Sequence, residues 1–385
     1  MLFRSRRDEL GVSPDDVTIT VLSAQPFHDI RVRNYEADLS ACRIPLADVL
    51  DPVDVRHVQA EVTAIDPASR CVTTTDGVHH YDRLVFALGS RLAAPDLPGL
   101  REHAFDVDTY DGAMRLQAHL ARLGAGEPDA RAVTAIVVGA GLTGIETACE
   151  LPDRLVAAFG GKDVKPRVIL IDHNQNVGSD MGASARPVIE AALADVGVQP
   201  RTGVRVSAVD ADGVVLSTGE RLEAATVVWC AGMRANPLTG QFGVERDRLG
   251  RLPVDDFLKV IGVQDVFAAG DVASARMDDE HMSVMSCQHG RPMGRYAGYN
   301  VVSDLLGEPM LPLRIPWYVT VLDLGPAGAV YTEGWDRHVV AQGEQAKATK
   351  VTINSQRIYP PLNRNRADLL AAAAPELQSR PSLGH

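Results

Sequence analysis

The feature that most constrains this chain is a glycine-rich loop between a short apolar run and a segment suited to a helix. Residues 134–138 are apolar or β-branched, which is typical of a buried parallel strand. Gly139, Gly141 and Gly144 follow in the spacing G-x-G-x-x-G, and residues 145–151 then favour a helix. This order predicts a dinucleotide-binding unit of the Rossmann type, with another Rossmann-type fold, such as a methyltransferase, as the alternative.

The loop and the next strand indicate which nucleotide binds. Gly139 permits the tight turn, Gly141 lets a pyrophosphate approach the backbone, and Gly144 lets helix and strand pack closely. The helix N-terminus offers free N–H groups and a positive dipole end to the phosphates. The following strand, residues 167–172, ends at Asp172, whose carboxylate suits an adenosine ribose and repels a 2′-phosphate. We therefore expect NADH rather than NADPH.

Two parts of the sequence resemble each other. Residues 62–89 predict a strand, a hairpin and a second apolar strand that ends at Gly89, and residues 206–232 repeat this pattern up to Gly232. The offsets between the copies are 144 residues at the start and 143 at the end. This constancy predicts two nucleotide-binding domains of common design, with chance similarity of two hairpins as the alternative.

The duplication extends upstream, where residues 17–23 match the strand that ends at Asp172. Residues 6–11 before them are typical of the tail of a helix that ends in glycine. In this alignment, the first strand, the phosphate loop and most of the first helix of the first domain fall ahead of Met1. We expect roughly 15–30 further residues to complete that unit, and weak FAD binding without them.

Composition excludes several classes of protein. The chain has 385 residues and a net charge of −12, which argues against nucleic-acid binding through bulk charge. The start has no apolar stretch typical of a secretory signal, so we expect a cytoplasmic protein. The five cysteines are scattered without a CxxC pair, which argues against a disulfide framework, a redox cysteine pair and a zinc site: Cys42, Cys71, Cys149, Cys230 and Cys287.

Four stretches in order, residues 81–90, 139–151, 250–255 and 265–273, resemble those of a type II NADH dehydrogenase-like flavoprotein of the pyridine nucleotide-disulfide oxidoreductase superfamily. The resemblance spans about residues 17–310. It implies an α/β fold with two Rossmann-like dinucleotide-binding domains, one for FAD and one for NADH. It also implies that Asp271, which follows Gly270, hydrogen-bonds the ribityl chain of FAD.

The resemblance also implies two catalytic residues. Glu146 matches a glutamate that lies near the flavin and quinone site of the family, where a buried carboxylate could manage a proton. The alternative for Glu146 is a helix N-terminal acid that the dipole stabilises. Gln288 matches the first glutamine of the family's quinone motif. The chain departs from that motif at Cys287 and Pro292, and Ser23 stands where an acid is expected to hold the FAD ribose.

The expected organisation is an FAD domain of residues 1–107 and 249–306, an NADH domain of residues 108–248, and a small α+β region of residues 307–385. In the last region we expect strands near 317–322 and 329–332 and a helix over 344–356. This region is interpreted as a small core or a homodimer face, with a lid over the flavin as the alternative. Its last apolar run is too short to predict strong membrane docking.

These observations predict an FAD-dependent enzyme that takes hydride from NADH and passes electrons to a quinone or another small acceptor. At most we expect peripheral contact with the cytoplasmic face of a membrane. One alternative is a reductase for a protein acceptor, similar to ferredoxin reductases. The other is a degenerate NADH-binding module without flavin turnover.

The first testable prediction concerns nucleotide choice. Because the Asp172 carboxylate repels a 2′-phosphate, Asp172→Ala should weaken the preference for NADH over NADPH. The ratio of the two dissociation constants, measured by titration of wild type and variant, checks this. Equal binding of both nucleotides by the wild type would show that the assignment is wrong.

Overall fold

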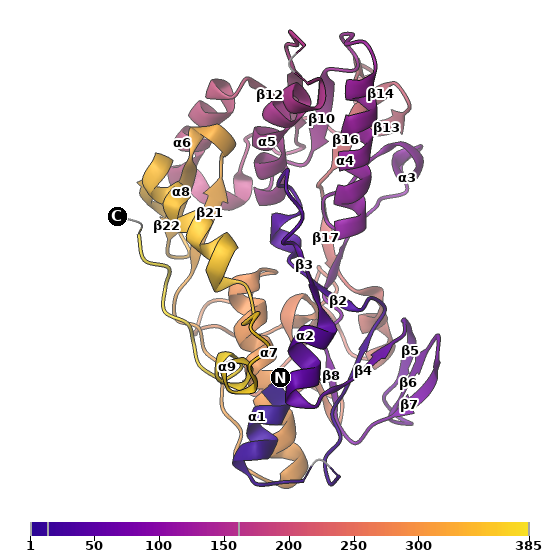
Figure 1. The fold of residues 1–385 in the computed structure, drawn as a ribbon, viewed down its shortest axis with the longest axis vertical. Helices are drawn as coiled ribbons and strands as arrows, with labels where there is room; N and C mark the ends of the chain where they lie inside the picture. The colour runs from indigo at the N-terminus through magenta and orange to yellow at the C-terminus, as the bar shows by residue number, and fades with distance from the viewer. Residues whose placement is uncertain (1, 14, 161, 384–385) are drawn as a thin grey trace.

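The computed structural model describes residues 2–13, 15–160 and 162–383. Figure 1 shows two lobes, with the N-terminus in the lower lobe and the C-terminal region along one side of both. The glycine loop lies in the upper lobe, and the glycine–aspartate motif at residues 270–271 lies in the lower lobe. The two predicted nucleotide-binding motifs therefore lie in different lobes, and the two lobes and the C-terminal region meet between them.

The upper lobe is built on a four-stranded parallel sheet in the order β12-β11-β10-β16. β10 (Thr134–Val138) is central and buried at every position, and α5 (Leu142–Ala158) follows the glycine loop. These elements confirm the predicted strand and helix. The other elements of this lobe are α3 (Leu100–His103), α4 (Tyr110–Ala125), β11 (Arg167–Ile171), η3 (Ser179–Met181), α6 (Gly182–Asp195), β12 (Val198–Arg201) and β16 (Thr226–Trp229). The 3₁₀ turn η4 (Pro237–Phe242) lies in the lower lobe, where Phe242 packs against Phe86.

Two three-stranded antiparallel sheets confirm the duplication. Their first strands share a register irregularity, between Val62 and Ala64 in one sheet and between Val206 and Ala208 in the other. The second sheet thus repeats the first down to a local distortion of the backbone. The strands are β5 (Val62–Asp66), β6 (Cys71–Thr74) and β7 (Gly77–His80), and β13 (Val206–Asp210), β14 (Gly213–Leu216) and β15 (Arg221–Glu223).

The lower lobe contains two separate parallel pairs. β1 (Thr20–Ser23) pairs with β4 (Arg56–Gln59), and β8 (Leu84–Phe86) pairs with β19 (Val266–Ala268). In the upper lobe, β10 joins the corresponding strands β11 and β16 into one sheet. No strand of the described residues joins β1 to β8.

The remaining elements of the lower lobe surround these pairs. α7 (Cys287–Leu306) packs against α1 (Leu2–Glu9) and against the turn at residues 270–272. The others are β2 (Phe27–Asp29), η1 (Arg31–Arg33), β3 (Arg43–Pro45), α2 (Leu46–Leu50), η2 (Asp51–Val53), β9 (Ser90–Leu92), β17 (Met233–Ala235), β18 (Leu252–Pro253), η5 (Gly270–Val272) and β20 (Ala273–Ser274).

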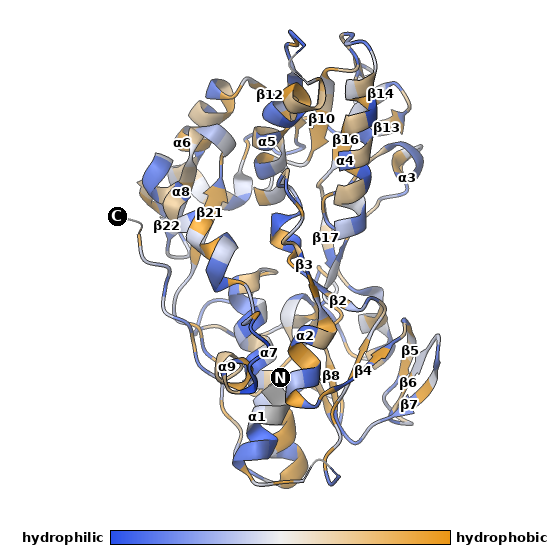
Figure 2. Ribbon diagram, in the orientation of Figure 1, coloured by the Kyte–Doolittle hydropathy of each residue, from blue (hydrophilic) through white to orange (hydrophobic). Residues whose placement is uncertain are grey.

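The C-terminal region forms an antiparallel sheet in the order β21-β22-β23, which packs on α5 and α6. Leu322, Leu324 and Val330 belong to the same core as Leu151 and Ile189 of the upper lobe. β10 and β21 accordingly carry hydrophobic colour in Figure 2. The elements are β21 (Val319–Asp323), η6 (Gly325–Ala327), β22 (Ala329–Glu333), β23 (His338–Gln342), α8 (Gly343–Thr352), a π-helical turn (Ile353–Arg357) and α9 (Arg366–Ala372).

The two predicted strands and the predicted helix of this region are therefore confirmed, while β23 was not predicted from the sequence. Over the parts of the chain that the structure describes, no helix combines the length and the apolar character needed to cross a membrane.

Replacing each of two glycines by alanine tests how closely the C-terminal sheet packs against α5. Gly325 and Gly334 both have positive φ, at 60° and 76°. A Cβ on Gly325 would lie 2.7 Å from the backbone oxygen of Cys149, whereas a Cβ on Gly334 would meet no atom within 4 Å. Gly334→Ala should therefore cost only the conformational penalty of about 1–2 kcal/mol. Gly325→Ala should cost more, because the sheet must also shift from α5. Urea unfolding of the two variants checks this, and equal losses would contradict the close packing.

Candidate functional site

The glycine loop has two kinds of glycine. A Cβ on Gly144 would overlap the carbonyl oxygen of Gly139, and a Cβ on Gly139 (φ 104°) would lie 2.9 Å from the backbone of Ala231. Gly141 has an ordinary φ of −78°, and its Cβ would meet only Asp180, at 3.8 Å. Gly139 and Gly144 are therefore required by packing within the protein, whereas Gly141 leaves open space where the predicted pyrophosphate would approach.

Asp172 lies at the end of β11 beside this loop and is 7% exposed. One carboxylate oxygen accepts a hydrogen bond from the backbone N–H of Ala140 at 2.6 Å, and the other accepts one from Asn174 at 2.7 Å. The carboxylate therefore braces the glycine loop, a structural task that the sequence did not reveal. Its predicted contact with the ribose remains a prediction.

Gly89 and Gly232 follow the last strands of the two repeats, β8 and β16, with φ of 68° and 79°. The segments after them pair as β9 and β17, so that Ser90 lies opposite Ala235. The structure thus brings the two predicted glycines to the antiparallel ribbon that connects the lobes. A Cβ on Gly89 would meet no atom within 4 Å, which leaves the backbone bare on the FAD side.

Asp271 lies in η5 and is surrounded by groups that hold its carboxylate. The Ser90 hydroxyl donates to Asp271 Oδ2 at 2.6 Å, and Arg31 Nη1 lies 3.9 Å from the same oxygen. Arg31 also donates through Nε to Asp108 at 2.9 Å. A Cβ on Gly270 would meet nothing within 4 Å. An oriented carboxylate beside bare backbone fits a flavin nucleotide. No sequence pattern indicated Arg31 or Asp108.

Glu146 is buried and forms an ion pair that the sequence did not predict. Its Oε1 lies 2.7 Å from Lys350 Nζ on α8, and the two side chains are 8% and 10% exposed. The same oxygen accepts a hydrogen bond from the backbone N–H of Asp323 at 3.2 Å. Burial raises the pKa of Glu146, against the opposing effect of the Lys350 charge. The carboxylate therefore has the environment of a proton-handling group.

A second ion pair lies beside the first. Lys347 Nζ, one helical turn from Lys350, lies 2.5 Å from Asp323 Oδ1, and the Tyr35 hydroxyl donates to Asp323 Oδ2 at 3.2 Å. The Lys347 side chain is 31% exposed, whereas that of Asp323 is 8% exposed. Residues of the lower lobe, the upper lobe and the C-terminal region thus meet in one polar cluster.

Gln288 lies at the start of α7 and binds the backbone before and within β21. Its side-chain nitrogen donates to the carbonyl of Trp317, and its oxygen accepts from the N–H of Val319, both at 3.2 Å. Gln288 and Glu146 therefore contact the same strand, from the lower and the upper lobe. The structure brings the two predicted catalytic residues to one place, through contacts that the motif did not indicate.

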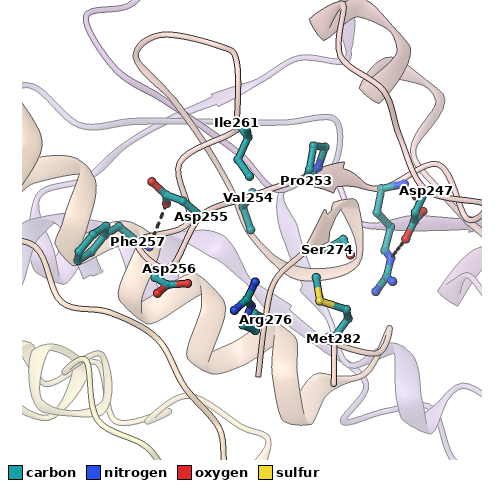
Figure 3. Close-up of a pocket in the computed structure, with 11 residues that line it drawn as sticks. Asp247, Pro253, Val254, Asp255, Asp256, Phe257, Ile261, Ser274, Arg276 and Met282 are labelled. Carbon is teal, nitrogen blue, oxygen red and sulfur yellow. Dashed lines mark hydrogen bonds and ion pairs between the residues drawn. The ribbon is translucent and has the colours of Figure 1, made fainter. Parts of the chain in front are cut away.

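A separate cavity of about 460 Å³ lies in the lower lobe (Figure 3). Its charged lining is largely paired within the protein: Arg251 binds Asp247 at 2.6 Å, and Asp255 accepts backbone N–H groups of Phe257 and Lys259. None of the predicted site residues lines it. The candidate site is therefore the junction of the lobes, where the predicted residues meet, and not this cavity.

Comparison with known proteins places the chain in a family. The model of the pyridine nucleotide-disulphide oxidoreductases matches residues 17–294. The chain belongs to this family. An NADH dehydrogenase-like protein of Mycobacterium tuberculosis is 70% identical over 378 residues, which cover 98% of this chain and 94% of that protein. A type II NADH:quinone oxidoreductase of Staphylococcus epidermidis is 30% identical over 376 residues, with 90% of each chain covered.

A solved structure shares the fold. The NDH2 of Plasmodium falciparum in complex with NADH superimposes with a TM-score of 0.76 at 12% identity, and the match covers 96% of this chain and 95% of that one. This likeness confirms the predicted α/β fold with two dinucleotide-binding domains.

The two kinds of loop glycine give a testable separation of stability from binding. Gly144→Ala should lower the thermal stability, because its Cβ overlaps the Gly139 carbonyl. Gly141→Ala should leave the stability close to wild type and weaken NADH binding, because its Cβ enters only the open space. Thermal unfolding and NADH titration of both variants check this. If Gly141→Ala binds NADH as tightly as the wild type, that space is not the pyrophosphate position.

Proposed function

We propose that this oxidoreductase uses FAD to take hydride from NADH and passes the electrons to a quinone. The observation that carries the proposal is the buried ion pair of Glu146 and Lys350, which contacts the same strand, β21, as Gln288 does. Glu146 follows the last glycine of the nucleotide loop by two residues. Membership in the family and the NADH:quinone oxidoreductases among its relatives support the proposal.

The NADH is held in the upper lobe by groups already in place. The N-terminus of α5 supplies N–H groups for the pyrophosphate, and Gly141 leaves the space for it. Asp172 stands beside the loop in position for the ribose, with its carboxylate fixed by two backbone N–H groups.

The FAD is held in the lower lobe by Asp271, with Ser90 and Arg31 orienting its carboxylate. When bound, FAD accepts the hydride and releases electrons to the acceptor, and the protein supplies binding and orientation. The bare backbone at Gly89 and Gly270 lets a flat ring system approach closely.

The ion pair handles the proton that quinone reduction requires. Conversion of NADH, a proton and a quinone to NAD⁺ and a quinol takes one proton from solvent in each turnover. Glu146 and Lys350 share a proton at the junction, away from bulk water. A general acid in such a position contributes to the rate without any change in the hydride step.

Protein purified in the presence of excess FAD should oxidise NADH with a soluble quinone such as menadione and show flavin absorption. Reduction of a ferredoxin but not of the quinone would favour the protein-acceptor reductase. A colourless protein that binds NADH without turnover would favour the non-catalytic module.

The pH dependence tests the role of Glu146. Burial raises its pKa in the folded protein, so neutral Glu146 favours the folded state at low pH and this contribution is lost as the pH rises through the folded pKa. The rate of quinone reduction should fall over the same pH range, the alkaline limb of the pH profile, because protonated Glu146 becomes scarce there. Glu146→Gln should lower the quinone rate by roughly 10²-fold and remove that limb.

Two controls accompany this variant. The rate with hexacyanoferrate(III), which takes up no proton, should change much less. Glu150→Gln, one turn further along α5, should keep the limb, because Lys350 pairs with Glu146. Loss of the limb in both variants would contradict a specific role for Glu146.

A further inference from the structure

Two arginines from the segment around β2 and β3 contact the start of α4 in the upper lobe. Arg31, in the turn after β2, donates through Nε to Asp108 Oδ1 at 2.9 Å. The guanidinium carbon of Arg43, in β3, lies 3.9 Å from the centre of the Tyr110 ring. In Figure 1, β2 and β3 lie between the two lobes, beside the lower end of α4. These contacts therefore connect one lobe to the other.

The position of these arginines is unusual for a helix. The N-terminus of a helix carries a positive partial charge, which favours nearby anions and disfavours nearby cations. Two carboxylates offset this effect, because Arg31 pairs with Asp108 and Arg43 Nη2 lies 3.4 Å from Asp111 Oδ1. The arginines thus do not stabilise α4 through its dipole. What they provide is a connection between segments that are distant in the sequence.

Arg31 also contacts the segment that leaves the lower lobe. Its Nη1 donates to the hydroxyl of Ser90 at 2.9 Å and to the carbonyl of Ser90 at 3.2 Å, and that hydroxyl donates to Asp271. The second oxygen of Asp108 accepts the N–H of Leu92 at 3.2 Å. Ser90 and Leu92 are the ends of β9, in the ribbon that connects the lobes. Arg31 therefore joins the predicted flavin carboxylate, this ribbon and the start of α4.

The guanidinium of Arg31 is fixed by all three of its nitrogens. Nε and Nη2 both donate to Asp108, and Nη1 donates to Ser90. The side chain of Asp108 is 13% exposed and that of Arg31 is 31% exposed, so water competes little for the carboxylate. A planar group with five N–H donors can hold two partners at a set angle, which an ammonium group cannot do. The pair therefore sets an orientation as well as a distance.

The orientation of the lobes matters for the proposed reaction. NADH is assigned to the upper lobe and FAD to the lower lobe, so the hydride has to pass from a nucleotide in one lobe to a nucleotide in the other. Transfer requires the reacting atoms to be about 3–3.5 Å apart and aligned. A small rotation between the lobes would change this distance while each nucleotide stayed bound in its own lobe. A contact that fixes the lobes thus acts on the rate and leaves the affinities unchanged.

We propose that the Arg31–Asp108 pair fixes the relative orientation of the two lobes and thereby positions NADH for hydride transfer to FAD. This proposal rests on the proposed function and adds two positioning residues to it. In the step, the hydride carries two electrons from NADH to FAD, so NADH is oxidised to NAD⁺ and FAD is reduced. Arg31 and Asp108 exchange no proton or electron in this step. Their contribution is the geometry of the junction.

Asp108→Ala removes the carboxylate of the pair without changing any contact of Asp271. In flavin-loaded protein with excess FAD, the rate constant of flavin reduction at saturating NADH should fall by roughly 10- to 100-fold, as measured by anaerobic stopped-flow absorbance. The dissociation constant of ADP-ribose, which lacks the nicotinamide, and the flavin content should stay as in the wild type. Arg115→Gln is the matched control, because Arg115 pairs with Asp106 at 3.1 Å just before the same helix, and it should keep the wild-type rate.

Arg31→Gln decides the question if Asp108→Ala does not fold. It should slow flavin reduction to a similar extent, and the double variant should be no slower than the slower single variant, because one interaction is lost in all three. An unchanged rate in either single variant, or an equal loss in Arg115→Gln, would overturn the proposal. A loss of ADP-ribose affinity in parallel with the rate would also overturn it, since it would show a general structural role. Failure of the proposed function would instead appear as absence of flavin reduction by NADH in the wild type.

Discussion

A buried ion pair between Glu146 and Lys350 sets how the segments at the centre of this protein meet. Taking two charges out of water costs several kcal/mol per ion unless further hydrogen bonds satisfy them. Here the backbone N–H of Asp323 and the carbonyl of Val321 supply those bonds. Because both backbone groups belong to β21, the pair is satisfied only when α5, α8 and β21 meet in one arrangement.

The lower lobe joins this arrangement through Gln288 at the start of α7. An edge strand with unpaired backbone groups tends to pair with other chains. In this protein, side chains from α7, α5 and α8 cover most of the edge of β21. The strand thereby sets the relative positions of α7 in the lower lobe and α5 in the upper lobe. The sequence left the C-terminal region open between a small core, a homodimer face and a lid. In the structure, its sheet belongs to the upper-lobe core and supports the candidate site.

Glycines in this fold serve two purposes that look alike in the sequence. Gly144 and Gly325 lie where a Cβ would strike the backbone of another segment, so their replacement disturbs packing. Gly141, Gly89 and Gly270 lie where a Cβ would meet little or nothing, which leaves open space beside the backbone at the proposed nucleotide sites. Only coordinates distinguish the two, because the difference lies in what stands beyond the missing side chain.

The sequence by itself determined the Rossmann unit around Gly139, the duplication, the α/β fold and the family, because these depend on local patterns and fixed spacings. It also singled out Glu146 and Gln288. It could not identify Lys350 or Asp323, which contact Glu146 across 204 and 177 residues without any motif of their own. The domain boundaries stay predictions. Tertiary structure alone decided which side chains share the edge of β21, because hydrogen bonds between distant segments depend on packing and leave no period in the sequence.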